Sequence, residues 1–363
     1  MSRRVGLVVG DTPGHFFPAV AVAQALQRRE STDVLLFGPV SGRAADLAND
    51  HGFRFQPVRA SAIARVGAVG VAAAGLRTLA GIADARTIIQ RERLQLVVAF
   101  GGYASGAVVL AARSRGCATV ILEANAILGI ANRLLARVAD RACVSEWTSR
   151  AAFPRDRVVV TGWPMRDDMN QLATVTREWP AAKVVRVLVS SGSRGGEFMA
   201  THVPLVLEQL MRNGLSIEVR HQAADANCAA IARAYAERGI IADVSASIAD
   251  MASAYQWATL AIARAGAGTI SELALAALPA LLVPLGDAAE NHQHANARLY
   301  AETGAALCMT EDEWRDDEAA EALRNFVRPD SAQRASKAAR VMATPNAAEA
   351  VVDTCEQLMR GRW

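Results

Sequence analysis

The feature that most constrains this 363-residue chain is a repeated alternation of short apolar runs with alanine-rich stretches. The runs are rich in β-branched residues and end at glycine or polar residues, which is typical of buried strands. The candidate strands of the first half are at residues 5–9, 34–37, 96–100, 119–122, 141–144 and 158–161. Because helical stretches lie between most of them, the pattern predicts βαβ units and a mostly parallel sheet.

The same alternation begins again at residues 184–190 and continues with candidate strands at 216–220, 260–263 and 280–284. The proline-containing residues 162–183 between the two series predict a connection, and the chain length favours about two domains. We expect one Rossmann-like domain at residues 1–162 and a second at residues 163–345. Residues 346–363 predict a helix that, by analogy with two-domain α/β enzymes, packs back on the first domain.

Composition places the chain among globular proteins and excludes several classes. Apolar residues make up 52% of the sequence and the net charge is +3, which is compatible with anionic substrates but too mild to favour nucleic acid. The five cysteines are dispersed and form no C-x-x-C pair, as expected of reduced thiols. The apolar run after Met1 is too short for a signal peptide. We therefore expect a cytoplasmic protein with no nucleic-acid partner.

One apolar stretch, residues 63–83, leaves two interpretations open. It is shorter than the uninterrupted run of ~18–20 residues that a membrane span needs, and it contains Arg65 and Arg77. It is either a helix of the protein core, which we slightly favour, or a helix that lies on a membrane surface with its arginines near anionic lipid. The second interpretation predicts a peripheral place at the inner face of the cell membrane.

A glycine-rich turn, Gly10-Asp-Thr-Pro-Gly-His15, follows the first candidate strand and precedes a helical stretch with Pro18 near its start. Such a strand–turn–helix unit directs backbone N–H groups and the positive end of the helix dipole at an anion. His15 adds a group that can change its charge near neutral pH. The alternative is that His15 only caps a turn in an ordinary βα unit.

Further motifs follow along nearly the whole chain. They are Gly101-Gly-Tyr-Ala-Ser-Gly106, Glu123-x-Asn125, Gly162-x-Pro164-x-Arg166, Gly192-Ser193-x-Gly195, His221-Gln222, Ile248-x-Asp250-Met251, Arg264-Ala-Gly-Ala-Gly-Thr-Ile-Ser-Glu272 and His292-Gln293-x-x-Asn296. In this order they resemble the MurG family, the UDP-N-acetylglucosamine transferases that complete the lipid-linked peptidoglycan precursor. The resemblance implies a GT-B α/β fold, with two Rossmann-like domains facing across a cleft. The first would bind the acceptor and the second the UDP-sugar.

The resemblance also assigns roles to residues. His15 would be the catalytic base of an inverting transfer, and Glu272 would hold the ribose diol of the donor, since a carboxylate accepts two hydroxyl hydrogen bonds. The other donor-binding residues would be Arg166, Gly192, Ser193, Ile248, Met251, Ala267, Gly268, Thr269, His292, Gln293 and Asn296. The acceptor-binding residues would be Asp11, Thr12, Gly14, Gly102, Tyr103, Ser105, Glu123 and Asn125. The sequence has no D-x-D triplet, so we expect no metal and no other cofactor.

The acceptor side departs from the family pattern. Asp11 and Pro13 stand where the first loop of the family has glycines, and Leu122 and Ala124 replace two polar residues. These changes slightly favour a soluble, specialised metabolite as acceptor over the undecaprenyl-diphospho-muramoyl-peptide lipid. The donor is expected to be a UDP-sugar, with N-acetylglucosamine the favoured sugar. Two other classes stay open, a non-hydrolysing UDP-sugar epimerase and a non-catalytic nucleotide-sugar binding protein.

Overall fold

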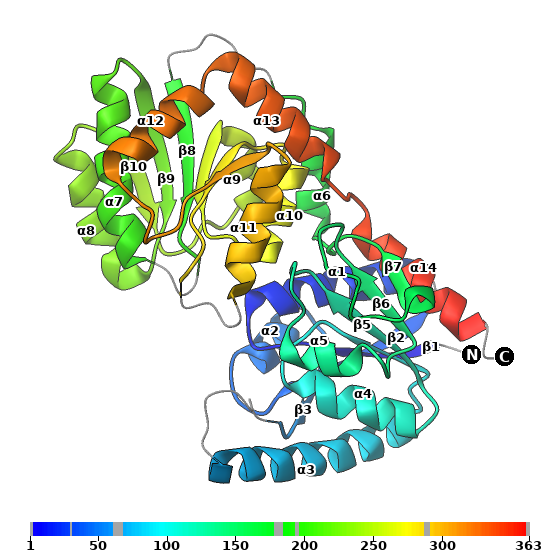
Figure 1. Cartoon of the computed structure of the whole chain (residues 1–363). Helices are drawn as coiled ribbons and strands as arrows, with labels where there is room; N and C mark the ends of the chain where they lie inside the picture. The colour runs from blue at the N-terminus through cyan, green and yellow to red at the C-terminus, as the bar shows by residue number, and fades with distance from the viewer. Residues whose placement is uncertain are drawn as a thin grey trace. The chain divides into compact units, whose positions relative to one another are not determined.

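A computed structural model of the chain describes residues 3–29, 31–60, 68–177, 184–192, 196–286 and 291–360. The chain divides into two compact units (Figure 1). Unit 1 contains Met1–Arg166 and Asn346–Trp363, and unit 2 is Asp167–Pro345. Each unit has one parallel sheet with helices on its faces. The expected α/β class with two parallel sheets is therefore confirmed.

The sheet of unit 1 has seven parallel strands in the order β3-β2-β1-β4-β5-β6-β7. They are β1 (Arg3–Val8), β2 (Thr32–Pro39), β3 (Arg54–Val58), β4 (Leu96–Ala99), β5 (Ala118–Glu123), β6 (Arg141–Val144) and β7 (Val158–Val160). The sequence analysis did not predict β3. This strand lies at the edge of the sheet and carries Arg54, Gln56 and Pro57, so it lacks the apolar run by which the buried strands were found.

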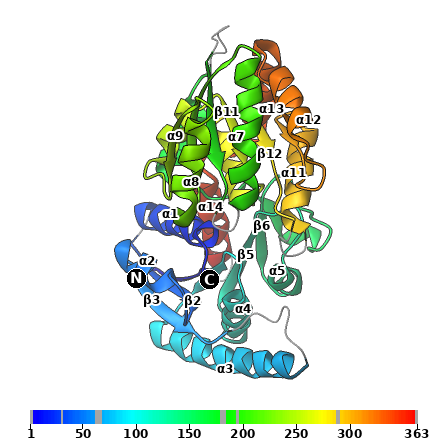
Figure 2. The same ribbon diagram turned by 90° about the vertical axis from the view of Figure 1, so that its left-hand side faces the viewer.

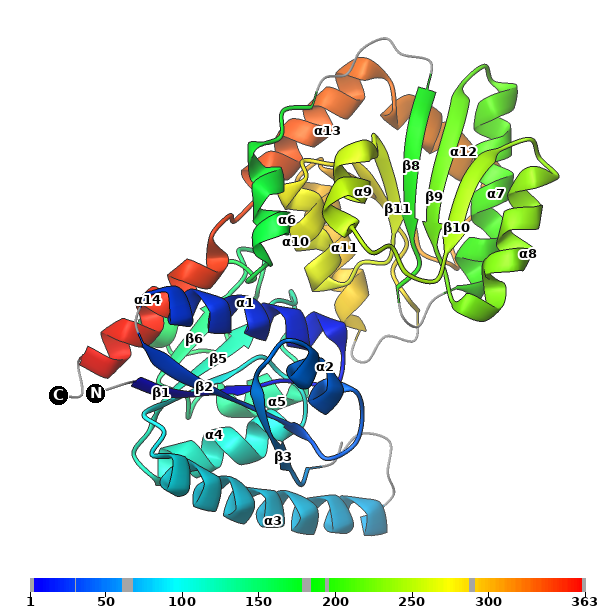
Figure 3. The same cartoon turned by 180° about the vertical axis from the view of Figure 1, so that it is seen from behind.

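Helices cover both faces of this sheet. They are α1 (Pro13–Arg29), α2 (Ala44–Asp50), α3 (Ala68–Glu92), α4 (Ala104–Ser114), α5 (Ile130–Leu135) and α14 (Ala347–Arg360), and a 3₁₀ turn spans Arg155–Arg157. Figures 1 and 3 show α1 and α14 on one face and α3 and α4 on the other. Helix α14 is joined to α1 by ion pairs of Glu349 with Arg28, at 3.0 Å, and with Arg29, at 2.8 Å. The end of the chain thus packs on unit 1.

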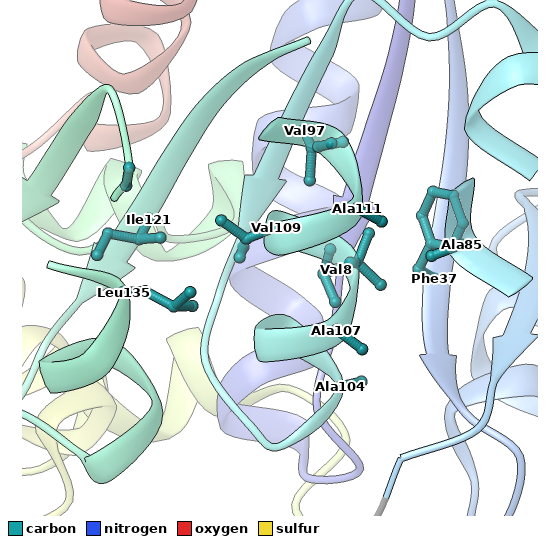
Figure 4. Close-up of a cluster of buried hydrophobic side chains, with 14 of the residues drawn as sticks. Val8, Phe37, Ala85, Val97, Ala104, Ala107, Val109, Ala111, Ile121 and Leu135 are labelled. Atoms are coloured by element: carbon teal, nitrogen blue, oxygen red, sulfur yellow. The ribbon is translucent and has the colours of Figure 1, made fainter. Parts of the chain in front are cut away.

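The core under α4 explains why the helices are rich in alanine. Ala104, Ala107 and Ala111 of α4 are fully buried against Val8 and Val97 of the sheet, as Figure 4 shows. Short side chains let the helix backbone approach the sheet closely, while the branched residues of the strands fill the layer between them. Each buried valine stabilises the fold by about 1.5–3 kcal/mol relative to an exposed one.

The sheet of unit 2 has six parallel strands in the order β10-β9-β8-β11-β12-β13. They are β8 (Val184–Ser190), β9 (Ser216–Gln222), β10 (Ile241–Ser245), β11 (Leu260–Ala263), β12 (Ala280–Leu282) and β13 (Ala306–Cys308). The helices are α6 (Asp167–Gln171), α7 (Glu197–Arg212), α8 (Asp225–Ala236), α9 (Met251–Trp257), α10 (Ala267–Leu275), α11 (His292–Glu302), α12 (Asp316–Phe326) and α13 (Pro329–Val341), with a 3₁₀ turn at Leu172–Thr174. Helices α7, α8 and α12 contribute to one core cluster with the strands. Figures 2 and 3 show how the remaining helices surround the sheet.

The two sheets share one topological feature that locates ligand sites. In unit 1, β1 lies between β2 and β4, and in unit 2, β8 lies between β9 and β11. The chain therefore leaves the first strand of each unit in one direction and returns on its other side. Ligands of parallel α/β sheets bind outside the carboxyl ends of the strands at such a switch point. The glycine turns after β1, β4, β8 and β11 lie at these ends.

Candidate active site

His15 lies at the switch point of unit 1, where the turns after β1 and β4 meet. It belongs to the first turn of α1, and its imidazole packs against two glycines. A Cβ atom on Gly10 would lie 2.5 Å from His15 Nδ1, and one on Gly101 would lie 3.2 Å from His15 Nε2. Gly101 also has φ of +99°, a conformation that side chains disfavour. Glycine at both positions therefore leaves the space that the ring occupies.

Thr12 orients the ring of His15. Thr12 Oγ1 lies 3.0 Å from His15 Nδ1, and the backbone carbonyl of Thr12 accepts from the His15 N–H at 3.0 Å. A neutral imidazole carries one proton. With this proton on Nδ1 and donated to Thr12, the lone pair of Nε2 faces the Gly101 turn and can accept a proton from a substrate. The contact accommodates either tautomer, and the one with the proton on Nδ1 is the tautomer that a general base at Nε2 requires.

Burial and one carboxylate set the pKa of His15. Loss of solvent around the ring lowers this pKa from its ordinary value, and the negative charge of Glu123 offsets part of the decrease. A lowered pKa keeps the imidazole neutral, and therefore able to accept a proton, at pH 7. The arrangement suits a base that works near neutral pH.

Glu123, at the end of β5, is buried, and both of its carboxylate oxygens accept hydrogen bonds from other residues of the chain. Its Oε1 accepts from the backbone N–H and the side-chain Nδ2 of Asn125, both at 2.9 Å. Its Oε2 accepts from Gly129 N at 3.1 Å and from Asn132 Nδ2 at 3.0 Å. Glu123 therefore orders the loop after β5 while it supplies the negative charge that acts on His15. Sequence reasoning found Glu123 and Asn125 but missed Asn132, whose spacing matches no motif.

Replacing Glu123 with glutamine is expected to move the acid limb of kcat/KM to lower pH. The negative charge raises the pKa of His15, so its removal lowers that pKa, and the base stays unprotonated further into acid. A pH profile of kcat/KM between about pH 5 and 8, around the ordinary histidine pKa, measures the shift. Glu146→Gln, at an exposed ion pair with Arg150, is the control that keeps the wild-type profile. An acid limb that moves to higher pH would contradict the assignment.

The structure shows where the unusual Asp11 points. Its Oδ1 accepts from the backbone N–H of Arg43 at 3.0 Å, in the loop before α2. A Cβ atom on Gly42, whose φ is +107°, would lie only 1.8 Å from this oxygen. The carboxylate thus lies against the β2–α2 loop, where an N–H group neutralises part of its charge. Asp11 replaces a glycine of the family pattern, and its carboxylate has a hydrogen-bond donor within the protein.

The other acceptor-side residues surround the same turns. Tyr103 is 37% exposed, and burial, with a smaller contribution from the Asp11 charge, raises the pKa of its hydroxyl. Gly102 has φ of +81°, and a Cβ atom there would lie 3.2 Å from Gly10 Cα. Ser105 is fully buried and its hydroxyl donates to Gly101 O at 2.7 Å. Ser105 therefore shapes the turn that holds His15. Gly14, beside His15 in the first turn of α1, is exposed.

Arg166, which the resemblance assigns to the donor, is the last residue of the first segment of unit 1. Its guanidinium lies 5.2 Å from the ring centroid of Phe17 in α1, a cation–π distance. Phe17 in turn contacts His51, with ring centroids 6.0 Å apart. The aromatic contact holds Arg166 near the start of α1, because Phe17 lies two residues after His15 in that helix.

In unit 2, helix α10 presents its N-terminus at the switch point. Its N-cap residue is Gly266, and no side chain caps the first turn. The N–H groups of Ala267, Gly268 and Thr269 therefore point out of the helix toward the loops, together with the positive end of its dipole. This is the geometry that binds phosphate groups at helix ends. Arg264, just before the helix, is buried and pairs with Glu311 at 2.6 Å.

Glu272 lies one turn further along α10 and is half-buried. Its Oε2 accepts from the hydroxyl of Tyr255, on α9, at 2.8 Å. Burial and the charge of Glu272 raise the pKa of Tyr255 well above its ordinary value, so the hydroxyl stays a donor. The sequence analysis found Glu272 and missed Tyr255, because a tyrosine on an apolar helix face is most often a core residue.

The glycine turn after β8 has a buried support. Ser191 Oγ lies 3.2 Å from His221 Nε2, and His221 Nδ1 lies 3.1 Å from the hydroxyl of Tyr235. All three side chains are fully buried, and burial lowers the pKa of His221 to about 4, so the ring stays neutral. Gly192 follows with φ of +67°. Ser193, the expected phosphate contact, lies outside the described residues.

The remaining donor-side residues lie around the ends of β10, β11 and β12. Asn296 is buried and its Nδ2 donates to Ala265 O at 3.1 Å, while Gln293 Oε1 accepts from Leu285 N at 3.0 Å. His292 begins α11 beside them. These side chains order the backbone next to the α10 N-terminus. Ile248 and Met251 are half-buried at the start of α9, whose N-cap Asp250 accepts from Ser253 N at 2.8 Å.

The structure thus forms two clusters from residues far apart in the chain. In unit 1 the loops after β1, β4 and β5 bring His15, Gly101 and Glu123 together. In unit 2 the loops after β8 and β11 gather Gly192 and the α10 N-terminus. The described residues contain no group of three or more His, Cys, Asp or Glu side chains that could hold a metal ion.

Comparison with known proteins assigns the chain to a family. Residues 5–144 match the glycosyltransferase family 28 N-terminal domain and residues 186–352 match the glycosyltransferase family 28 C-terminal domain. One relative from Xylella fastidiosa (strain M12) is 35% identical over 97% of this chain and 95% of its own. Another from Nitratidesulfovibrio vulgaris (strain DSM 19637 / Miyazaki F) is 38% identical over 99% of this chain and 98% of its own. Both are called UDP-N-acetylglucosamine–N-acetylmuramyl-(pentapeptide) pyrophosphoryl-undecaprenol N-acetylglucosamine transferase.

Solved structures show the same architecture. MurG of Acinetobacter baumannii is similar with a TM-score of 0.81 and 28% identity, over 98% of this chain and 99% of its own. UDP-GlcNAc 2-epimerase of Neisseria meningitidis, solved with bound UDP-GlcNAc, reaches a TM-score of 0.66 at 13% identity, over 98% and 100% of the two chains. At this low identity the second likeness shows the fold alone.

The two parallel α/β units have the GT-B fold, and the matches to both glycosyltransferase domains show that the chain is a UDP-sugar glycosyltransferase. The chain belongs to glycosyltransferase family 28, and its resemblance to the MurG proteins is confirmed.

Proposed function

We propose that this enzyme transfers N-acetylglucosamine from UDP-N-acetylglucosamine to a hydroxyl group of the undecaprenyl-diphospho-muramoyl-peptide lipid, with inversion at the anomeric carbon. The observation that carries the proposal is the neutral, oriented His15 at the switch point of a chain that matches such transferases over nearly its full length. A base at this position suits removal of a proton from an acceptor hydroxyl.

The proposed reaction is a single displacement. The acceptor oxygen forms a bond to the anomeric carbon, the bond from that carbon to the diphosphate oxygen breaks, and UDP leaves with the bonding electron pair. The hydroxyl proton goes to Nε2 of His15. One base and one displacement predict inversion of the anomeric configuration.

The donor is assigned to unit 2. The N–H groups of Ala267, Gly268 and Thr269 and the turn at Gly192 suit the diphosphate, and their fixed dipoles stabilise the charge that develops on the leaving UDP. Arg166 adds a cation to this role. Glu272 is assigned to the ribose hydroxyls and Ile248, through its backbone, to the uracil, with Met251 beside it. His292, Gln293 and Asn296 are assigned to the sugar pocket, where Gln293 and Asn296 order the backbone around it.

Two acceptor classes were open in the sequence, and the lipid is now favoured. The first reason is the full-length likeness to relatives whose names specify that acceptor. The second is Asp11, whose carboxylate accepts from Arg43 N and is therefore partly neutralised where a diphosphate of the acceptor would approach. A soluble, specialised metabolite is the alternative acceptor.

The test is an assay of the full-length protein with UDP-N-acetylglucosamine and the lipid-linked muramoyl peptide. We expect UDP release and a lipid-linked disaccharide of inverted configuration, identified by mass spectrometry and NMR. UDP release with a soluble acceptor but not with the lipid would assign the alternative acceptor. Formation of the 2-epimer without any acceptor would favour an epimerase, and UDP binding without any product would favour a binding protein.

We further propose that neither a metal ion nor another cofactor takes part. The sequence lacks the D-x-D triplet that commonly binds a metal–diphosphate complex, and the α10 N-terminus offers N–H groups for the same charge. In the assay above, EDTA is expected to leave turnover unchanged, and strict loss of turnover in EDTA would refute this part of the proposal.

We propose that α3 contacts the inner face of the cell membrane. Of the expected stretch at residues 63–83, positions 63–67 lie outside the described residues. Further along α3, Leu76 is 69% exposed and Leu79 is 64% exposed, with the exposed Arg77 between them. Leu76 and Leu79 are three residues apart and lie on one side of the helix, and an exposed apolar strip with a basic residue next to it suits anionic lipid. Among the described residues, no helix is long and apolar enough to cross a membrane.

Replacing both Leu76 and Leu79 with glutamate is expected to abolish sedimentation of the protein with vesicles of anionic phospholipid. The change removes apolar area and adds charge of the repelling sign. Val341→Glu, at an 82% exposed residue of α13 in unit 2, is the matched control and is expected to bind as the wild type does. Equal binding of the double variant would place the membrane contact elsewhere.

A further inference from the structure

The hydroxyl of Tyr255 joins two helices of unit 2 at the carboxylate of Glu272. Tyr255 comes from α9 and is fully buried, and its hydroxyl donates to Glu272 Oε2 at 2.8 Å. A glutamate side chain has several rotamers, and a hydrogen bond from a rigid aromatic residue restricts them. A bond to a charged acceptor is also among the stronger hydrogen bonds in proteins.

Arg177 fixes the same two helices relative to each other. Its guanidinium donates to the backbone carbonyls of Tyr255 and Ala258, at the end of α9, and of Ala276, at the end of α10. A positive charge at helix C-termini offsets the negative ends of their dipoles. Burial, with the nearby charge of Arg340, lowers the pKa of Arg177 to about 10, so the group stays charged at pH 7. Arg177 therefore holds the two helices that carry Tyr255 and Glu272 in a fixed relative position.

We infer that Tyr255 is a positioning residue for the donor: it holds the Glu272 carboxylate in the orientation that receives the ribose hydroxyls of a uridine nucleotide. This inference rests on the proposed function, which assigns Glu272 to the ribose. The physical gain is preorganisation, because a carboxylate that is already oriented loses less conformational entropy when the nucleotide binds. Tyr255 itself touches no substrate in this scheme.

The test compares two ligands that differ only at the ribose. Isothermal titration calorimetry measures the binding of UDP and of 2′-deoxy-UDP to the full-length protein and its variants. Tyr255→Phe keeps the side-chain volume and removes the hydroxyl. We expect it to weaken UDP binding by about two- to tenfold, because the freed Glu272 side chain then loses its rotamer freedom only when the nucleotide binds. Binding of 2′-deoxy-UDP should change much less, so that the preference for UDP shrinks.

Tyr300→Phe is the matched control. Tyr300, on α11, is also buried, and its hydroxyl has no hydrogen-bond partner among the described residues. It lies near Tyr255. Loss of this hydroxyl is expected to leave the preference for UDP unchanged. The thermal unfolding midpoint of each variant checks that a folded protein is compared.

The outcomes separate this inference from the function on which it rests. If Tyr255→Phe weakens both nucleotides equally, or weakens neither, the positioning role is wrong. If Glu272→Ala keeps the wild-type preference for UDP, Glu272 does not hold the ribose and the donor assignment itself fails. If Glu272→Ala loses the preference while Tyr255→Phe retains it, the donor assignment stands and only the role of Tyr255 falls.

Discussion

Replacing His15 with alanine is expected to lower kcat by about 10²–10⁴-fold, the contribution of a general base. UDP affinity is expected to stay close to that of the wild type, because the donor is assigned to unit 2. The physical reason is that the ring is neutral, oriented by Thr12 and placed at the carboxyl ends of β1 and β4. Initial rates of UDP release at saturating substrates, with calorimetric titration of UDP, measure both quantities.

A second histidine of unit 1 supplies the control. His51 is exposed and packs beside Phe16 and Phe17, with ring centroids 5.8 and 6.0 Å away. His51→Ala is expected to keep turnover, because the ring lies outside the glycine turns. Turnover that survived in His15→Ala would assign the base to another residue, and loss of UDP binding in that variant would place His15 in the donor site.

Replacing Gly10 with alanine is expected to lower kcat by at least about 100-fold while the protein stays folded. The added Cβ would lie 2.5 Å from Nδ1 and 3.0 Å from Cγ of His15, so the ring must move. Displacement of a catalytic group by about 1 Å can cost a factor of about 10² in rate. The same movement disrupts the contact of Nδ1 with Thr12, so the ring is no longer held in one orientation.

Gly106→Ala is the matched control for Gly10→Ala. Gly106 lies within α4, and a Cβ atom there would meet nothing within 4 Å. This variant is expected to keep full activity and to be slightly stabilised, since alanine restricts the unfolded chain and favours helix. Steady-state rates and thermal unfolding midpoints distinguish the two variants. Equal turnover in Gly10→Ala and wild type would show that the site tolerates a displaced imidazole.

Local pattern was sufficient for most of the fold. Runs such as residues 96–100 and 141–144 are buried on both faces of a parallel sheet, so they are continuously apolar and can be recognised without a structure. Three edge strands, β3, β10 and β13, were missed because an edge strand is partly exposed and need not be apolar. The presence of Tyr255 and Asn132 at the sites was missed for a related reason. Their roles depend on neighbours 17 and nine residues away, at spacings that follow no helix or strand period.

The direction of the Asp11 carboxylate could not be predicted from the sequence and is given only by the structure. The sequence places a carboxylate in a turn that is suited to an anion, which is unfavourable unless the charge is directed elsewhere. The structure directs it at Arg43 N, 32 residues further along the chain, next to Gly42. No local pattern relates these positions, because the loop after β2 reaches the turn after β1 only through strand pairing.

By itself the sequence determined the α/β class, most strands of the two series and the family, and it led to the proposed base and ribose carboxylate. Hydrophobic periodicity and glycine turns are local properties, and the ordered motifs can be read in one dimension. Only the tertiary structure decided what holds those groups. The ring of His15 packs against Gly101, which is 86 residues away in the chain, and Glu123 raises the pKa of His15. The hydroxyl of Tyr255 donates a hydrogen bond to Glu272. The contact between His15 and Gly101 follows from the strand order, because the parallel pairing of β1 and β4 places their carboxyl ends side by side.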